Sequence, residues 1–165
     1  MHRINLISTN KWIANIIIFL IIIITIAVIT SYIVVLYLIP ESVIGKYILE
    51  NIYYIFFVVF SIIMYFIITG LYYYRIKIDS SVVYITAYRI IFFSTKPRNF
   101  LDISHTMLSD FCFFNRPFSF NRTLMIKIET YTGKKVVKRF NLTFLSKKEE
   151  EKISKVLKQI IAKNS

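Results

Sequence analysis

The sequence predicts a membrane α-helical hairpin followed by a mainly-β barrel or sandwich that a C-terminal α-helix closes. Three observations predict this fold class. Residues 13–39 and 51–74 carry no charged side chain, and each run exceeds the roughly 20 apolar residues that cross a bilayer. Residues 75–142 show strand patterns separated by turn residues. Residues 147–162 show the periodicity of an amphipathic helix.

These patterns divide the chain of 165 residues into a short series of segments. We expect an N-terminal tail at 1–12, membrane helices at 13–39 and 51–74, an outer loop at 40–50, and a cytoplasmic domain at 75–165 with its helix at 147–162. The first apolar run is far longer than the roughly 7–15 residues of a signal-peptide core, which favours a retained anchor. Trp12 before the first run and Tyr72–Tyr74 at the end of the second resemble interfacial aromatic belts.

The charge distribution predicts the topology of the hairpin. Arg3 and Lys11 precede the first run without an acidic residue, whereas the segment between the runs has one lysine and two glutamates. From Arg75 onward there are 18 Lys and Arg residues against 7 Asp and Glu. Because short loops rich in Lys and Arg stay in the cytoplasm, we expect a multi-pass protein of the cytoplasmic membrane with both termini cytoplasmic. The single cysteine, Cys112, fits a reducing compartment.

The second half of the chain has six or seven short strand patterns in meander order. Two of them are strong, since residues 123–130 and 135–142 alternate apolar and polar residues on either side of the turn at Thr132-Gly133. Residues 75–79 also alternate, and residues 82–94 are rich in β-branched and aromatic types. Residues 96–99 read as a turn, and weaker strand patterns follow at 100–103 and 110–114.

The C-terminal helix has both an apolar stripe and a start signal. Ser146 and Glu149 have the spacing of a capping box, in which each side chain satisfies a free backbone N–H. The stripe consists of Ile153, Val156, Leu157, Ile160 and Ile161. We expect this stripe to cover the open end of the β structure.

Residues 85–93, Ile-Thr-Ala-Tyr-Arg-Ile-Ile-Phe-Phe, resemble the second-hairpin signature of bacterial PH-like and GRAM domains. The later strands, Gly133 and the final helix are placed as in that superfamily, and the resemblance covers roughly residues 75–162. A two-helix hairpin followed by one such domain is similar to small bacterial membrane proteins with a bacterial PH domain. The resemblance implies a PH-like fold and a role in the bacterial envelope, which in such proteins includes tolerance to membrane-active bacteriocins.

The sequence contains no signature of catalysis. His105 lies near Asp102, Asp110 and Cys112, but a lone cysteine and a lone histidine lack the paired spacing of zinc sites. There is no glycine-rich phosphate loop and no nucleophile elbow. We therefore expect no enzymatic activity, no cofactor and no metal.

The basic residues of the domain are the candidate binding residues. Their simplest interpretation is a solvated face. The alternative is contact with anionic lipid, in which each Lys or Arg near the leaflet contributes about 1 kcal/mol. A nucleic-acid partner is not expected on a membrane-anchored domain. The candidates for anionic-lipid contact are Lys134, Lys135, Lys138, Arg139, Arg116 and Arg122.

Three functional hypotheses follow. The leading one is a non-enzymatic, membrane-anchored PH-like module that presents a surface or sheet edge to a membrane or cytoplasmic protein partner. The second is an immunity or tolerance protein against an antimicrobial peptide. The third is an accessory subunit of a transporter or membrane enzyme, because the apolar runs contain no side chain that ionises at neutral pH and could form a pathway of their own. The partner and the oligomeric state stay open at this stage.

Overall fold

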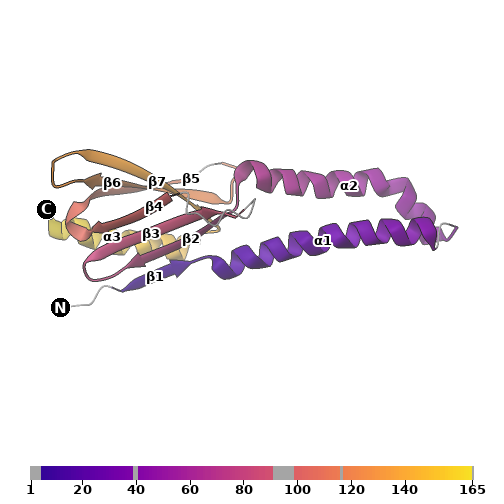
Figure 1. The fold of residues 1–165 in the computed structure, drawn as a ribbon, viewed down its shortest axis with the longest axis horizontal. Coiled ribbons are helices and arrows are strands. Elements are labelled where there is room, and N and C mark those ends of the chain that lie inside the picture. The colour runs from indigo at the N-terminus through magenta and orange to yellow at the C-terminus, as the bar shows by residue number, and fades with distance from the viewer. Residues whose placement is uncertain (1–4, 39–40, 91–98, 116, 165) are drawn as a thin grey trace. The chain divides into compact units, whose positions relative to one another are not determined.

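The computed structural model describes residues 5–38, 41–90, 99–115 and 117–164. The chain forms two compact units. Residues 15–69 form a helical unit, and residues 1–14 together with 70–165 form a mainly-β unit (Figure 1). The second unit therefore combines both ends of the chain around the inserted helices.

The helical unit consists of two antiparallel apolar helices, α1 (Lys11–Tyr37) and α2 (Val43–Thr69). Each has 27 residues and is about 40 Å long at 1.5 Å per residue, whereas a bilayer core is about 30 Å thick. Both are long and apolar enough to cross a membrane. Tyr32 of α1 meets Phe56 of α2 edge-to-face, with ring centroids 6.1 Å apart.

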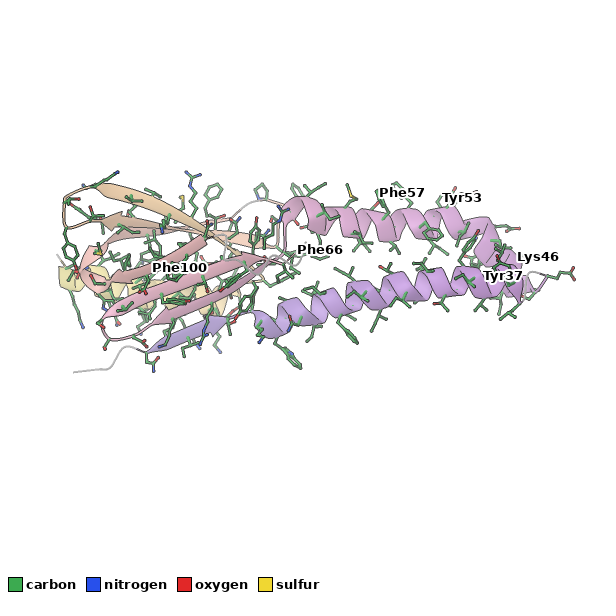
Figure 2. The ribbon with its side chains drawn as sticks, in the orientation of Figure 1. Tyr37, Lys46, Tyr53, Phe57, Phe66 and Phe100 are labelled. Atoms are coloured by element: carbon green, nitrogen blue, oxygen red, sulfur yellow. The ribbon has the colours of Figure 1, made fainter. Side chains whose placement is uncertain are left out.

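Large apolar side chains project from the exposed surface of both helices. Phe19 of α1 is 63% exposed, and Tyr53 and Phe57 project from α2 with 83% and 70% of their surface exposed (Figure 2). Polar side chains within the helices bond to the preceding turn: Thr25 Oγ1 donates to the carbonyl oxygen of Ile21 at 2.8 Å. A helix that is apolar all round and satisfies its own polar groups is typical of a lipid environment.

The expected outer loop at 40–50 is wrong for most of its length, because α2 begins at Val43. Ser42 caps this helix: its Oγ accepts from the N–H of Gly45 at 2.9 Å, and its carbonyl oxygen accepts from the N–H of Lys46 at 3.0 Å. Lys46 and Glu50, whose charges suggested a loop, lie in the first turns of α2. The cap signal of a serine before an apolar run outweighs these two charges.

The second helix ends at Thr69, five residues before the expected end of the 51–74 run. Gly70 follows with φ +75°, the left-handed conformation that favours glycine after a helix. A Cβ at this position would also lie 2.8 Å from the ring of Tyr72. Tyr72–Tyr74 therefore do not close the second apolar helix as expected, but begin strand β2 (Tyr72–Ile78).

The mainly-β unit contains two antiparallel sheets, each in meander order as expected. The four-stranded sheet has the order β1-β2-β3-β4 and the three-stranded sheet the order β5-β6-β7. The two sheets do not close into a barrel, so the expected barrel form is wrong. Their remaining strands are β1 (Leu6–Thr9), β3 (Val82–Arg89), β4 (Asn99–Ser104), β5 (Leu108–Asn115), β6 (Asn121–Glu129) and β7 (Lys135–Thr143).

Strand β1 corrects the assignment of residues 1–12 to a tail. It pairs antiparallel with β2, from Leu6 opposite Ile78 to Thr9 opposite Arg75. The Oγ of Ser8 in β1 also donates to Glu149 Oε1 at 3.3 Å. The hairpin is therefore inserted between two neighbouring strands of one sheet, rather than preceding a separate domain.

The two sheets and helix α3 (Lys147–Asn164) share one hydrophobic core. Helix α3 lies against β1 and β5, the edge strands of the two sheets, and against the short 3-10 helix η1 (His105–Met107) that links β4 to β5. Its buried stripe residues, Ile153, Leu157 and Ile160, are each at most 1% exposed. The expected cover over the open side of the β structure is confirmed.

The expected capping box of α3 is confirmed. The N–H of Glu149 donates to Ser146 Oγ at 3.2 Å, and Glu149 Oε2 accepts from the N–H of Ser146 at 3.3 Å. The expected turn at residues 96–99 lies outside the described residues, except for Asn99, which begins β4.

Candidate functional site

A buried asparagine lies where β1 passes into α1. Asn10 is 2% exposed. Its Nδ2 donates to the carbonyl oxygens of Tyr72 and Thr143, both at 2.8 Å, and its Oδ1 accepts from the N–H of Tyr74 at 2.9 Å. An amide side chain provides both the donors and the acceptor for this arrangement. The start of α1 is therefore tied to the start of β2 and to the end of β7.

Thr143 and Asn121 continue this network toward the end of α2. Thr143 Oγ1 accepts from the N–H of Tyr72 at 2.8 Å and donates to Asn121 Oδ1. Asn121 Nδ2 donates to the carbonyl oxygen of Gly70 at 2.9 Å. We call Asn10, Asn121 and Thr143 the junction residues. They tie both chain connections to the helices to one end of the mainly-β unit.

The junction residues are suited to holding the backbone in place rather than to catalysis. All three are at most 5% exposed, and none of their side chains ionises near neutral pH. A hydrogen bond of this kind contributes about 0.5–1.5 kcal/mol, but an unsatisfied buried partner costs about 1–3 kcal/mol. The arrangement therefore resists separation of the β sheets from the points where the helices begin and end.

The structure separates the predicted basic residues along the β6–β7 hairpin. Lys135 pairs with Glu129 beside the turn that contains Lys134, at the end of the strands opposite Asn121 and Thr143 (Figure 1). Lys138 and Arg139 lie in the middle of β7 and contact β4. Lys138 Nζ donates to the carbonyl oxygen of Phe100 at 2.8 Å, and the carbonyl oxygen of Arg139 accepts from the side-chain amide of Asn99 at 2.7 Å. Contact of these four basic residues with anionic lipid stays a prediction.

The two remaining basic candidates differ. Arg122, in β6, forms an ion pair with Glu150 of α3, and both side chains are mostly buried. Its guanidinium therefore links the second sheet to the helix. Arg116 lies outside the described residues. The six candidates do not form one basic patch in the part of the chain that the structure describes.

An open groove lies between the edge strand β5 and helix α3. It has a volume of about 540 Å³, and Phe111, Phe113 and Ile161 form part of its apolar lining. Lys158 adds an exposed positive charge from α3, whereas the carboxylate of Glu150, which also lines the groove, is paired with Arg122. Strand β5 has a neighbour on only one side in its sheet. A groove beside a sheet edge is the geometry that accepts an extended peptide as an added strand.

Within the described ranges, His105, Asp110 and Cys112 have separate environments. Burial lowers the pKa of His105, and the backbone carbonyl of this residue accepts from Asn164 Nδ2 at 2.6 Å. Asp110 forms an ion pair with Lys127 at 2.7 Å, and this partner lowers the pKa of Asp110. Cys112 is an exposed thiol. Among the described residues, no group of three His, Cys, Asp or Glu side chains could hold a metal ion.

Sequence reasoning missed the junction residues. Asn121 and Thr143 stand at the two ends of a predicted hairpin, and Asn10 lies three residues before a long apolar run. The only sign of such a residue in the sequence is a polar side chain at the boundary of an apolar element. Most exposed caps and turns have the same pattern, so it does not identify a buried junction residue. Only the pairing of β1 with β2 brings Asn10 to the other two.

Comparisons with protein-family models, with curated proteins and with solved structures found no match to this chain.

Proposed function

We propose that this chain is a non-enzymatic integral membrane protein whose mainly-β unit is a PH-like interaction module at the cytoplasmic membrane surface, with both termini in the cytoplasm. The observation that carries the proposal is the hydrogen-bonded junction. Asn10 precedes α1 directly and Gly70 follows α2 directly, and both are tied to the same end of the unit. A unit attached in this way stays beside the membrane that holds its helices.

The membrane part of the proposal is supported by the two apolar helices and by the charge distribution. Large apolar side chains remain exposed along α1 and α2, which is unfavourable in water at about 25 cal/mol per Å². Basic residues dominate the segments before and after the helices, which favours a cytoplasmic location for both.

The PH-like part of the proposal is supported by the order of the elements. Strands β2–β4, the three-stranded meander β5–β7 and the C-terminal helix follow one another, as the sequence resemblance over residues 75–162 implies, and β1 is added to the first sheet from before the helices. The signature segment begins in β3, where Ile85 and Thr86 are buried and Arg89 ends the strand. Residues 91–93 of the signature lie outside the described residues.

The groove between β5 and α3 supports a protein partner. Its apolar walls would hold alternate side chains of an extended segment, while the unpaired edge of β5 would supply backbone hydrogen bonds. The exposed charge of Lys158, which lines the groove from α3, would favour one direction of that segment.

Photocrosslinking from the single native cysteine tests this function. Cys112 is exposed and lines the groove, so a thiol-directed photocrosslinker on the full chain, in membranes of the producing cells, should give a discrete adduct. The matched control is Cys112→Ser with Tyr131→Cys, which moves the thiol to the exposed β6–β7 turn, and it should give no such adduct.

A second pair of variants tests whether the adduct depends on the groove. Ala162 lines the groove and is exposed, so Ala162→Arg should block the groove and abolish the adduct without loss of stability. Gln159→Arg places the same side chain on an exposed position of α3 and should leave the adduct intact. No adduct from Cys112, or the same adducts from both thiol positions, would contradict a partner in this groove.

A further inference from the structure

The turn between β5 and β6 exposes large apolar rings. Phe118 is 97% exposed and has φ +58°, a conformation that bulky L-residues seldom adopt. Phe114 and Phe120, on either side of the turn, are each 55% exposed. We call Phe114, Phe118 and Phe120 the aromatic tip. Exposed apolar surface that is concentrated at one tip marks an interaction site.

The base of the aromatic tip is held firmly. The ring of Phe120 stacks on that of Phe144, with centroids 5.1 Å apart and an interplanar angle of 28°. The N–H of Phe144 donates to the carbonyl oxygen of Phe120 at 3.0 Å, and the N–H of Asn121 donates to Ser119 Oγ at 3.0 Å. The turn therefore presents Phe118 from a supported base.

The aromatic tip lies at the end of the mainly-β unit where the helices attach. Asn121, three residues after Phe118, donates from its side-chain amide to the carbonyl oxygen of Gly70, and Gly70 directly follows α2. Trp12, in the first turn of α1 and within the same unit, is also 77% exposed. The nine residues of β6 separate this end from the opposite turn by about 30 Å.

We propose that the aromatic tip inserts into the boundary between headgroups and acyl chains of the bilayer that its own hairpin spans. This inference rests on the proposed membrane insertion of α1 and α2. Aromatic and other apolar side chains gain free energy at this depth, and the hairpin keeps the tip within reach of the surface. Residues 113–121 contain no acidic side chain that anionic lipids would repel. The tip would give the unit a third attachment and limit its rotation above the membrane.

Tryptophan fluorescence of the full chain in bilayers tests the proposal. Trp12 is the only tryptophan, so Trp12→Phe provides a silent background for single probes. The probes are Phe118→Trp at the tip, Tyr131→Trp in the opposite turn, where Tyr131 is 83% exposed, and Phe57→Trp in the middle of α2. Each probe is measured in vesicles whose lipids carry bromine either near the headgroup or deep in the acyl chain.

We expect Phe118→Trp to lose most of its fluorescence to shallow bromine and less to deep bromine. Phe57→Trp should show the opposite depth order, and Tyr131→Trp should not be quenched. If Phe57→Trp is quenched and Phe118→Trp is not, the tip proposal is overturned and the membrane anchor stands. The same holds if the unquenched Phe118→Trp has a blue-shifted spectrum, because such a shift would report a protein contact. An unquenched Phe57→Trp overturns both. Quenching of Tyr131→Trp in place of Phe118→Trp overturns the tip and favours lipid contact at the basic β6–β7 turn.

Discussion

Replacing Asn10 with leucine is expected to lower the free energy of unfolding of the mainly-β unit by about 3 kcal/mol or more. The substitution leaves three backbone groups without their partner: the buried carbonyl oxygen of Thr143, the buried N–H of Tyr74 and the partly buried carbonyl oxygen of Tyr72. Each unsatisfied buried group costs about 1–3 kcal/mol. Such a loss is a large fraction of the 5–15 kcal/mol that stabilises a typical domain.

Pulse proteolysis of the full chain in detergent micelles, over a series of urea concentrations, measures this loss. The matched control is Asn5→Leu, which makes the same change at an exposed position just before β1. The control should stay within about 0.5 kcal/mol of the parent. Equal urea midpoints for the two variants would show that the junction does not hold β1 and β2 together.

Replacing Leu157 with aspartate is expected to abolish cooperative unfolding of the mainly-β unit. Leu157 is fully buried in the core between the sheets and α3. An unpaired buried charge costs about 3–5 kcal/mol, in addition to the lost packing of the leucine side chain. Lys155→Asp introduces the same carboxylate on the exposed side of α3 and should unfold like the parent apart from a small shift.

The pH dependence of the Leu157→Asp variant provides a second criterion. Burial raises the pKa of the new carboxyl in the folded state, because an apolar environment disfavours its charged form. A folded-state pKa above the unfolded one means that stability is lost as pH rises. The variant should therefore regain part of its cooperative unfolding at pH 5, where more of the new carboxyl is protonated, and lack it at pH 7. A variant that unfolds like the parent at both pH values would show that α3 does not belong to the core.

The parts of the fold that local patterns encode were predicted from the sequence. The stripe Ile153–Ile161 and the capping box at Ser146 are each contained within a few residues, and the structure has both. The β6–β7 hairpin is equally local, since its strands flank a turn at Gly133 with φ +76°. These elements depend on neighbours in sequence, so periodicity and turn chemistry suffice.

The parts that depend on distant segments were not predicted. Strand β1 has four residues, and its partner β2 lies beyond both helices, so its pairing leaves no local pattern. The tyrosines at 72–74 suit both the end of an apolar helix and a strand, and the structure places them in β2, where the N–H groups of Tyr72 and Tyr74 donate to Thr143 and Asn10. The distance of Lys134 and Lys135 from the helix attachments also depends on distant segments, because Asn10 and Gly70 bond to Thr143 and Asn121 at the other end of the β6–β7 hairpin.

The topology of the full chain tests the central claim most directly. A reporter that is active only in the cytoplasm, fused after Ser165, should be active, and an exported reporter inserted after Glu41, between the helices, should also be active. This result is predicted because two spanning helices return the chain to the side from which it started, and the basic segments on both ends favour the cytoplasm. Activity of the exported reporter after Ser165 would contradict the anchored cytoplasmic module.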